Sequence, residues 1–278
     1  MIDNLAEIKS LLDESVIRYN NIDFIQDDPV QIPHLFTSKE DIEIAGFLSA
    51  TIAWGNRKSI IKNGFRLMEL MNRSPYDFLM DDDFLEQYKT EINLFVHRTF
   101  NGEDCFFFLK SLQNIYKSHG GLEQIFTDGF GLENSIYGAL KYFRSIFLKT
   151  PHSKRVEKHI SDVTSNSSAK RLNMFLRWMV RRDENGVDFG LWKNIPASAL
   201  MLPLDIHTGN VSRNLGLLAH KQNDWKAVEE ITKILRTFDE SDPIKYDYAL
   251  FGLGVSQRNI DFLYNQTNQT NHSSDRFL

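Results

Sequence analysis

The chain has 278 residues, of which 42% are hydrophobic and 25% charged, a composition typical of a soluble globular protein with one large or two modest domains. Its apolar runs, such as residues 105–109, are too short to cross a bilayer, and its single cysteine excludes an intrachain disulfide and a cysteine-ligated iron–sulfur cluster. The net charge of −5, taken whole, argues against a nucleic-acid partner. Acidic residues near the N-terminus are unlike a signal peptide, so we expect a cytoplasmic protein without a membrane partner.

Apolar residues recur at helical spacing through most of the chain. In chain order, the predicted helices cover residues 8–16, 41–50, 56 to about 74, 105–119, 132–148, 168–180, 206–215 and 223–238. Sustained period-two alternation is absent, and no Asn-Gly turn joins β-branched runs. The predicted fold class is therefore all-α, with ten or more helices.

Domain boundaries are indistinct in the sequence, and residues 1–264 are predicted to form a single all-α unit. The polar segment 150–168 is the best candidate for a hinge between two helical subdomains. Residues 265–278 are polar and low in complexity, so they are predicted to be disordered.

The net charge argues against a polyanionic binding partner, whereas the distribution of charge along the chain argues for one. Between residues 141 and 182, eleven Lys and Arg stand against Glu157 and Asp162, so this basic segment carries +9 and the remainder −14. Such asymmetry is typical of a nucleic-acid-binding face. A solvated surface balanced in space by acidic neighbours explains it equally well on charge alone.

The helix predicted after Ser167 has a lysine where helix design would place an acid. With Ser167 as N-cap, Lys170 falls in the first turn, near the positive end of the helix dipole and beside Arg171. One stripe must face the core: Leu172, Phe175, Leu176, Met179 and Val180. At about 100° per residue, Lys170 lies opposite that stripe, with Arg177 and Arg181 on its face. A locally unfavourable residue is typical of a functional site, although an exposed lysine tolerated at small cost is the alternative.

Asp205 follows an apolar run and precedes a predicted helix. Because Pro203 disfavours helix just before it, Asp205 is expected to be the N-cap, with Gly216 as the C-terminal stop. On these grounds capping is the favoured interpretation. His207 has no second histidine or cysteine at ligand spacing, so no metal site is predicted.

Two stretches match patterns of one superfamily. LPLDIHTGNVSRNLGL (residues 202–217) resembles the Asp-helix of the helix-hairpin-helix DNA glycosylases, and GFLSAT (46–51) followed by NRKSI (56–60) resembles their Leu-Ser-Ala helix and DNA-contacting turn. Residues 28–255 also resemble a bacterial family, frequent in Bacteroidetes, that is associated with this superfamily. The resemblance implies two helical subdomains with a cleft between them. It also implies removal of damaged bases, often through a lysine that forms a Schiff base with the sugar.

The resemblance places Asp205 on the family's catalytic Asp. Thr51 occupies the slot where relatives often carry a glutamine that fills the base stack after base flipping, and threonine is too short for that task. The residues predicted to contact nucleic acid are Thr51, Asn56, Arg57, Lys58, Arg171, Arg177, Arg181, His207 and Arg213.

The catalytic lysine is assigned from a part of the sequence that departs from the common pattern of the glycosylases. The usual Leu-Pro-Gly-Val-Gly hairpin, which carries the lysine about 18 residues before the Asp, is absent. Lys193 precedes Asp205 by only 12 residues, whereas Lys170 precedes it by 35. Ala169-Lys170 at the start of an apolar helix resembles the archaeal 8-oxoguanine glycosylase branch, which implies that Lys170 is the catalytic lysine.

The predicted function is a monomeric DNA glycosylase with abasic-site lyase activity, without a cofactor, acting on a damaged base, such as an oxidised purine, in duplex DNA. Lys170 would attack the sugar C1′ while Asp205 stabilises the positive charge that develops there. One alternative is a glycosylase-like module that binds nucleic acid without chemistry, favoured by the absent hairpin and by Thr51. Another is an α-helical protein-interaction domain whose basic segment contacts an acidic partner.

Overall fold

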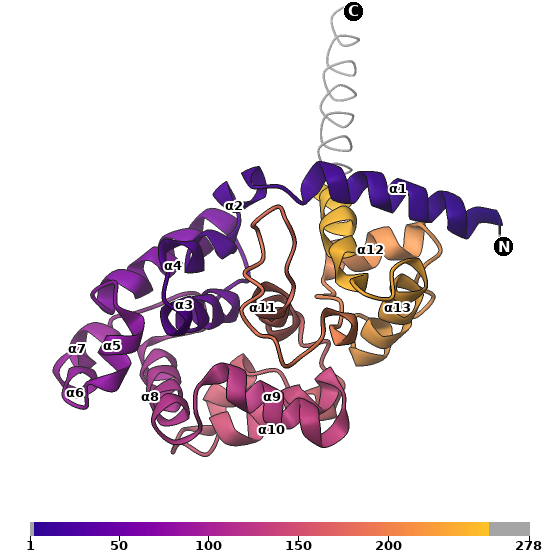
Figure 1. The fold of residues 1–278 in the computed structure, drawn as a ribbon. Helices are drawn as coiled ribbons and strands as arrows, with labels where there is room; N and C mark the ends of the chain where they lie inside the picture. Colours follow the sequence, from indigo (N-terminus) through magenta and orange to yellow (C-terminus); the bar gives the residue numbers. More distant parts are fainter. Residues whose placement is uncertain (1–2, 256–278) are drawn as a thin grey trace, which may run out of the picture.

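The structure is a computed structural model that describes residues 3–255 (Figure 1). Its α-helices are α1 Asp3–Tyr19, α2 Asp23–Gln26, α3 Lys39–Thr51, α4 Arg57–Leu70, α5 Pro75–Met80, α6 Phe84–Gln87, α7 Lys89–Asn93, α8 Gly102–Ser118, α9 Leu122–Glu133, α10 Ile136–Phe147, α11 Lys170–Val180, α12 Ile206–Asn214 and α13 Trp225–Phe238, followed by helix 246–255. Over this range the chain forms isolated bridges but no strand, and the predicted all-α fold class is confirmed. The tail predicted to be disordered, residues 265–278, lies outside the described residues.

Polar side chains define where the helices begin, as the sequence leads one to expect. Ser38 caps α3 through Asp41 N, and Asn101 and Asp104 form a reciprocal capping box at the start of α8. The helix predicted over residues 132–148 is instead two helices. Asn134 adopts a left-handed conformation (φ 47°) that ends α9, and Ser135 then caps α10.

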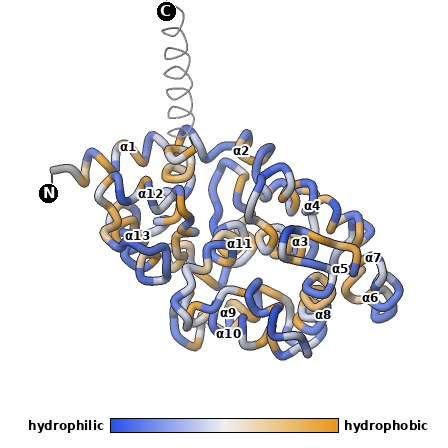
Figure 2. Tube along the Cα trace, turned by 180° about the vertical axis from the view of Figure 1, so that it is seen from behind, coloured by the Kyte–Doolittle hydropathy of each residue, from blue (hydrophilic) through white to orange (hydrophobic). Residues whose placement is uncertain are grey.

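Helix α11 lies at the centre of the molecule, and residues 172–180 are all buried. Helices α3–α7 lie on one side of α11, and α12 and α13 lie on the opposite side (Figure 1). Helices α8–α10 lie along a third side. Hydrophobic and hydrophilic stretches alternate along the outer helices, as expected where each helix buries one face (Figure 2). In residues 3–255, no helix combines the length and the apolar character that crossing a membrane requires.

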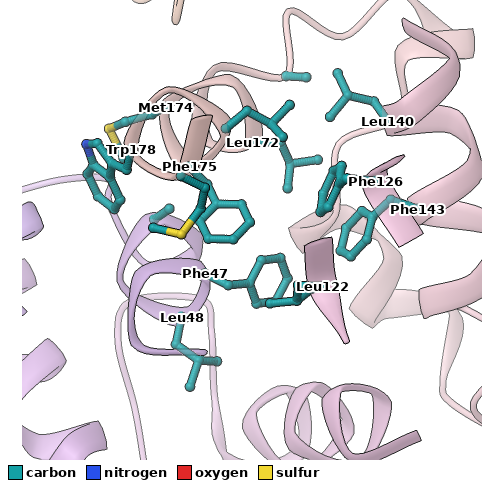
Figure 3. Close-up of a cluster of buried hydrophobic side chains, with 14 of the residues drawn as sticks. Phe47, Leu48, Leu122, Phe126, Leu140, Phe143, Leu172, Met174, Phe175 and Trp178 are labelled. Atoms are coloured by element: carbon teal, nitrogen blue, oxygen red, sulfur yellow. The ribbon is translucent and has the colours of Figure 1, made fainter. Parts of the chain in front are cut away.

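Aromatic side chains hold α11 against its neighbours (Figure 3). The ring of Phe47 on α3 packs edge-on against that of Phe175 on α11, with centroids 5.7 Å apart, and Phe126 stacks on Phe143 at 4.5 Å. Gly46 allows the close approach, since a Cβ there would lie 3.2 Å from Met179 Cε. Each buried aromatic or aliphatic side chain contributes roughly 1.5–3 kcal/mol, so this cluster fixes the position of α11 and of the residue that begins it.

The segment 150–168, predicted to be a hinge, packs against the rest of the structure. It contains the 3₁₀ turns η3 Lys154–His159 and η4 Val163–Ser165. The side chains of Val156, His159 and Ile160 are buried. Arg155 on this segment pairs with the buried Asp104 of α8, with Nη1 and Oδ1 2.8 Å apart.

Candidate active site

A cleft of about 880 Å³ opens where six segments meet. They are the 3₁₀ turn η1 Pro29–Gln31 with the residue before it, the turn between α3 and α4, the start of α11, the start of α12, the loop before α13, and helix 246–255. A recess of about 50 Å³ shares Asp28, Lys170, Met174, Asp205 and Phe251 with the cleft and is also lined by Asp247. One lysine and three carboxyl groups therefore face the same region.

Lys170 and Asp205, which are 35 positions apart in the sequence, line this cleft together. The predicted mechanism requires that they converge on one cleft, and the fold brings them there. The side chain of Lys170 is half-buried and forms no hydrogen bond or ion pair with the residues that the structure describes. Its amine is thus available to a ligand in the cleft.

Helix α11 begins differently from the prediction. The N-cap is Ala169 rather than Ser167, so Lys170 is the first residue of the helix instead of the third. Ala169 is buried and adopts a left-handed conformation (φ 47°), which is uncommon for a residue with a Cβ. Ser167 Oγ accepts a hydrogen bond from Ala169 N (3.3 Å), which supports this turn. Such strained backbone is concentrated at functional sites.

The predicted cap at Asp205 is confirmed. Its Oδ1 accepts hydrogen bonds from His207 N at 2.8 Å and Thr208 N at 2.9 Å. Asn223 Nδ2 donates to the backbone oxygen of Asp205 (3.0 Å) and further holds this turn. The second carboxylate oxygen, Oδ2, forms no hydrogen bond within the described part of the chain. Asp205 can therefore cap α12 and still present one oxygen to the cleft.

Several predicted contact residues lie at the mouth of the cleft. Asn56 caps α4 through Ser59 N (3.2 Å), and Arg57 extends its guanidinium over the ring of Phe251, 5.4 Å from the centroid. His207 also lines the cleft, whereas Lys58 is exposed in the first turn of α4 outside it.

Arg171 lines the cleft as well, but its guanidinium has partners in the protein. It lies over the ring of Trp54, 4.8 Å from the centroid, and donates to the backbone oxygens of His159 (3.1 Å) and Thr51. The ring of His97 packs edge-on against the ring of Trp54, and the ring of His159 stacks on it. These contacts make Trp54 and Arg171 a rigid part of the cleft wall.

The prediction that Arg177 and Arg181 face solvent and contact nucleic acid is wrong. Their side chains are 4% and 2% exposed. Asp188 lies between them, with Oδ1 3.3 Å from Arg177 Nε and Oδ2 2.9 Å from Arg181 Nη1. Arg177 also pairs with Asp247. The face opposite the apolar stripe exists as predicted, but residues 183–190 and helix 246–255 cover it.

Two further residues predicted to contact nucleic acid are enclosed by the protein or bonded within it. Thr51 is 4% exposed in the last turn of α3, so its side chain does not reach a ligand. Arg213 donates from Nε to His220 O (2.8 Å) and from Nη2 to Asn223 Oδ1 (2.7 Å), which ties α12 to the loop that follows it. The structure therefore corrects both assignments, because intramolecular acceptors satisfy Arg213 and packing encloses Thr51.

Part of the basic segment 141–182 is neutralised in space. Lys141 pairs with Glu133, Arg144 with Glu157 and Arg155 with Asp104, in addition to the two buried arginines of α11. Six of its eleven cations form no ion pair with a described residue: Lys149, Lys154, Lys158, Lys170, Arg171 and Arg182. The balanced-surface interpretation therefore describes five of the eleven cations, and a polyanion-binding face on the others stays a prediction.

The sequence did not reveal two residues of the site: Asp28, which lines the cleft and the recess, and Asp247, which lines the recess. Asp28 is buried, and its Oδ1 accepts a hydrogen bond from Val30 N (3.0 Å), as in an ordinary cap before a proline. Burial raises the pKa of Asp247 to about 6, although the nearby charge of Arg177 lowers it. The one available signal was the Asp-Pro pair at residues 28 and 29, which by itself indicates only a turn.

The fold and the cleft define an all-α protein with a lysine and three carboxyl groups around one recess. Within residues 3–255, no three His, Cys, Asp or Glu side chains are arranged to hold a metal ion. The sequence model of the family described as "Protein of unknown function (DUF2400)" matches residues 28–256, and the chain belongs to this family. Every residue that lines the cleft falls in the matched range. No curated protein and no solved structure matches the chain.

Proposed function

We propose that the protein is a DNA glycosylase with abasic-site lyase activity, built on a helix-hairpin-helix glycosylase-like fold whose cleft separates two helical subdomains. The observation that carries the proposal is the shared cleft of Lys170 and Asp205. An amine without a protein partner and a carboxylate with one free oxygen are the groups that a Schiff-base mechanism requires.

The dimensions and lining of the cleft support a flipped nucleotide as the ligand. A duplex must extrude the target base, at a cost of a few kcal/mol, before side chains reach the sugar. About 880 Å³ is ample for one nucleotide, and the rings of Trp54 and Phe251 supply apolar surface to the wall of the cleft. Arg57 at the mouth offers a cation to the phosphates on either side.

In this proposal the neutral amine of Lys170 attacks C1′, and the bond between C1′ and the damaged base breaks with its electron pair leaving on the base. Asp205 stabilises the positive charge that develops on the sugar through its free oxygen. The nitrogen, now bonded to C1′, then loses a proton, and the bond from C1′ to O4′ breaks as O4′ takes up a proton. The Schiff base that forms is the intermediate from which the strand is cut.

Reduction of the Schiff base tests the proposal. Duplexes that carry an abasic site or 8-oxoguanine are incubated with the protein and borohydride, and a covalent protein–DNA species is expected on a denaturing gel. If no damaged duplex is trapped although the protein binds DNA, the non-catalytic binding module is the correct interpretation. Binding affinity that is retained at high salt would instead favour an acidic protein partner, because contacts to phosphate groups weaken steeply as the salt concentration rises.

We expect Asp205→Asn to lower turnover by about 10²–10³-fold, because it removes the negative charge that faces the sugar. The fold should be retained, since Asn caps a helix about as well as Asp. Single-turnover base release measures the effect. Asp224→Asn is the matched control, because Asp224 caps α13 through Ala227 N and does not line the cleft. Equal losses in both variants would contradict a catalytic role for Asp205.

We expect Arg57→Ala to flatten the dependence of log affinity on log salt by up to about 0.9, the contribution of one phosphate contact. The measurement is DNA binding over a salt series, by fluorescence anisotropy. Arg73→Ala is the control, since Arg73 is exposed beyond the other end of α4 and pairs with Glu69. An unchanged slope for Arg57→Ala would place the DNA-binding surface elsewhere.

A further inference from the structure

A tight turn of residues 97–100 packs beside the cleft and is held there. His97 N donates to Phe100 O (2.8 Å) and Phe100 N donates to His97 O (3.0 Å), which closes the turn. The side chain of His97 is buried, its Nε2 donates to Trp54 O (3.1 Å), and its Nδ1 lies 2.9 Å from Asn63 Nδ2 on α4. The turn is therefore fixed against Trp54, which lines the cleft.

Arg98, at the apex of this turn, is a residue that local chemistry disfavours there. Its backbone is left-handed (φ 56°), a conformation that glycine and asparagine adopt in turns with less strain than arginine does. The side chain is exposed and forms no hydrogen bond or ion pair with the residues that the structure describes. Neither the backbone of the turn nor a polar contact within the described residues therefore accounts for an arginine at this position.

The side chain of Arg98 lies along the backbone of Gly55. A Cβ atom at Gly55 would lie 2.6 Å from Arg98 Nη1 and 2.9 Å from Arg98 Cδ, so a larger residue there would displace the arginine. Gly55 itself lines the cleft and has a φ of 101°, which glycine adopts freely. The guanidinium of Arg98 is therefore held at the rim of the cleft.

Positive charge surrounds the turn 54–57 between α3 and α4. Arg98 lies against its glycine, Arg171 lies over its tryptophan, and Arg57 is the first residue of α4. No carboxylate among the described residues forms an ion pair with any of these three arginines. Arg171 donates to two backbone oxygens, whereas Arg57 and Arg98 donate no hydrogen bond to a described residue. Two guanidinium groups without a counter-charge favour an anionic ligand.

We propose that Arg98 binds a phosphate of the DNA strand that enters the cleft, while Arg57 binds a second phosphate of the same strand. A guanidinium presents its N–H groups in a planar fork that matches the oxygens of a phosphate. Contacts of this kind fix the position and register of a strand and do not select a base. The inference rests on the glycosylase function proposed above, and it makes Arg98 a positioning residue of that cleft.

Arg98→Asn tests the contact. Asparagine tolerates the left-handed conformation better than arginine, so the melting temperature should be unchanged or higher while the affinity for DNA falls. Affinity is measured by fluorescence anisotropy over a salt series, on a duplex with a reduced abasic site, which cannot form a Schiff base. We expect the slope of log affinity against log salt to flatten by up to about 0.9, and the affinity at about 0.1 M salt to fall roughly 5- to 10-fold, the effect of one phosphate contact.

Arg73→Asn is the matched control. Arg73 is exposed, has the same left-handed backbone (φ 53°) and lies beyond the other end of α4, where it pairs with Glu69. Its replacement changes the net charge equally and should leave the slope and the affinity as they are. Arg98→Lys keeps the charge, so it should retain the slope and lose affinity only through the missing fork. Equal flattening in Arg98→Asn and Arg73→Asn would reflect net charge alone and would overturn the proposal.

Binding and chemistry are measured separately, so this contact and the proposed function fail separately. A flatter slope in Arg98→Asn supports the contact even if borohydride traps no DNA, which would reject only the glycosylase chemistry. Trapping by the unmodified protein together with a full slope in Arg98→Asn would reject the contact and keep the function. Weaker binding that comes with a lower melting temperature would show that Arg98 acts on the fold, and it would also reject the contact. A lack of DNA binding by the unmodified protein at low salt would reject both.

Discussion

Lys170→Gln is expected to abolish covalent trapping on DNA that carries an abasic site, with the fold intact. Glutamine is of similar length but has no nucleophilic amine, so no Schiff base can form. The fold should survive because Lys170 forms no hydrogen bond or ion pair with the residues in the described structure. Trapping is measured on a denaturing gel, and circular dichroism verifies the helical content of the variant.

Lys193→Gln is the control for that experiment. Lys193 donates from Nζ to the backbone oxygen of Gly190 and does not line the cleft. We expect trapping by this variant to equal that of the unmodified protein. Trapping that survived Lys170→Gln and disappeared with Lys193→Gln would show that the catalytic lysine had been assigned wrongly.

Arg177→Ala is expected to lower the free energy of unfolding by about 3–5 kcal/mol, the loss typical when one partner of a buried ion pair is removed. The variant leaves Asp188 and Asp247 buried beside a cavity, and the guanidinium also loses its contact with the ring of Tyr248, 4.3 Å from the centroid. Urea denaturation measures the change. Arg182→Ala, which alters an exposed neighbour, should change stability by no more than about 0.5 kcal/mol.

The loss of stability in Arg177→Ala should also depend on pH. The pKa of Asp247 is already raised to about 6 by burial, so the folded state binds a proton that the unfolded state releases, and stability falls as pH rises through that value. Removing Arg177 takes away an interaction that lowers this pKa, so the penalty for ionised Asp247 grows. We expect the variant to be closer to the unmodified protein at about pH 5 than at about pH 8. A loss of DNA affinity without a loss of stability would contradict the buried network.

Local chemistry in the sequence predicted much of the fold. The spacing of apolar residues identified α3, α4, α8, α11 and α13, because one buried face repeats every 3.6 residues whatever its partner is. Asp205 was identified as a cap for a similar reason, since the backbone N–H groups that donate to its carboxylate lie within three positions of it. The same local signal was missed at Asn134 and Ser135, where two helices were read as one.

The site itself depends on contacts between distant positions. The sequence determined that α11 has a polar face with Lys170, Arg177 and Arg181, and nothing within the helix distinguishes their surroundings. The tertiary structure decided that helix 246–255 and residues 183–190 cover the two arginines, while the lysine at the start of the helix remains at the cleft. Asp28 reaches the same recess from 142 positions away. Periodicity shows which residues share a face, but only packing between elements decides which faces are buried and which carboxyl groups remain unpaired.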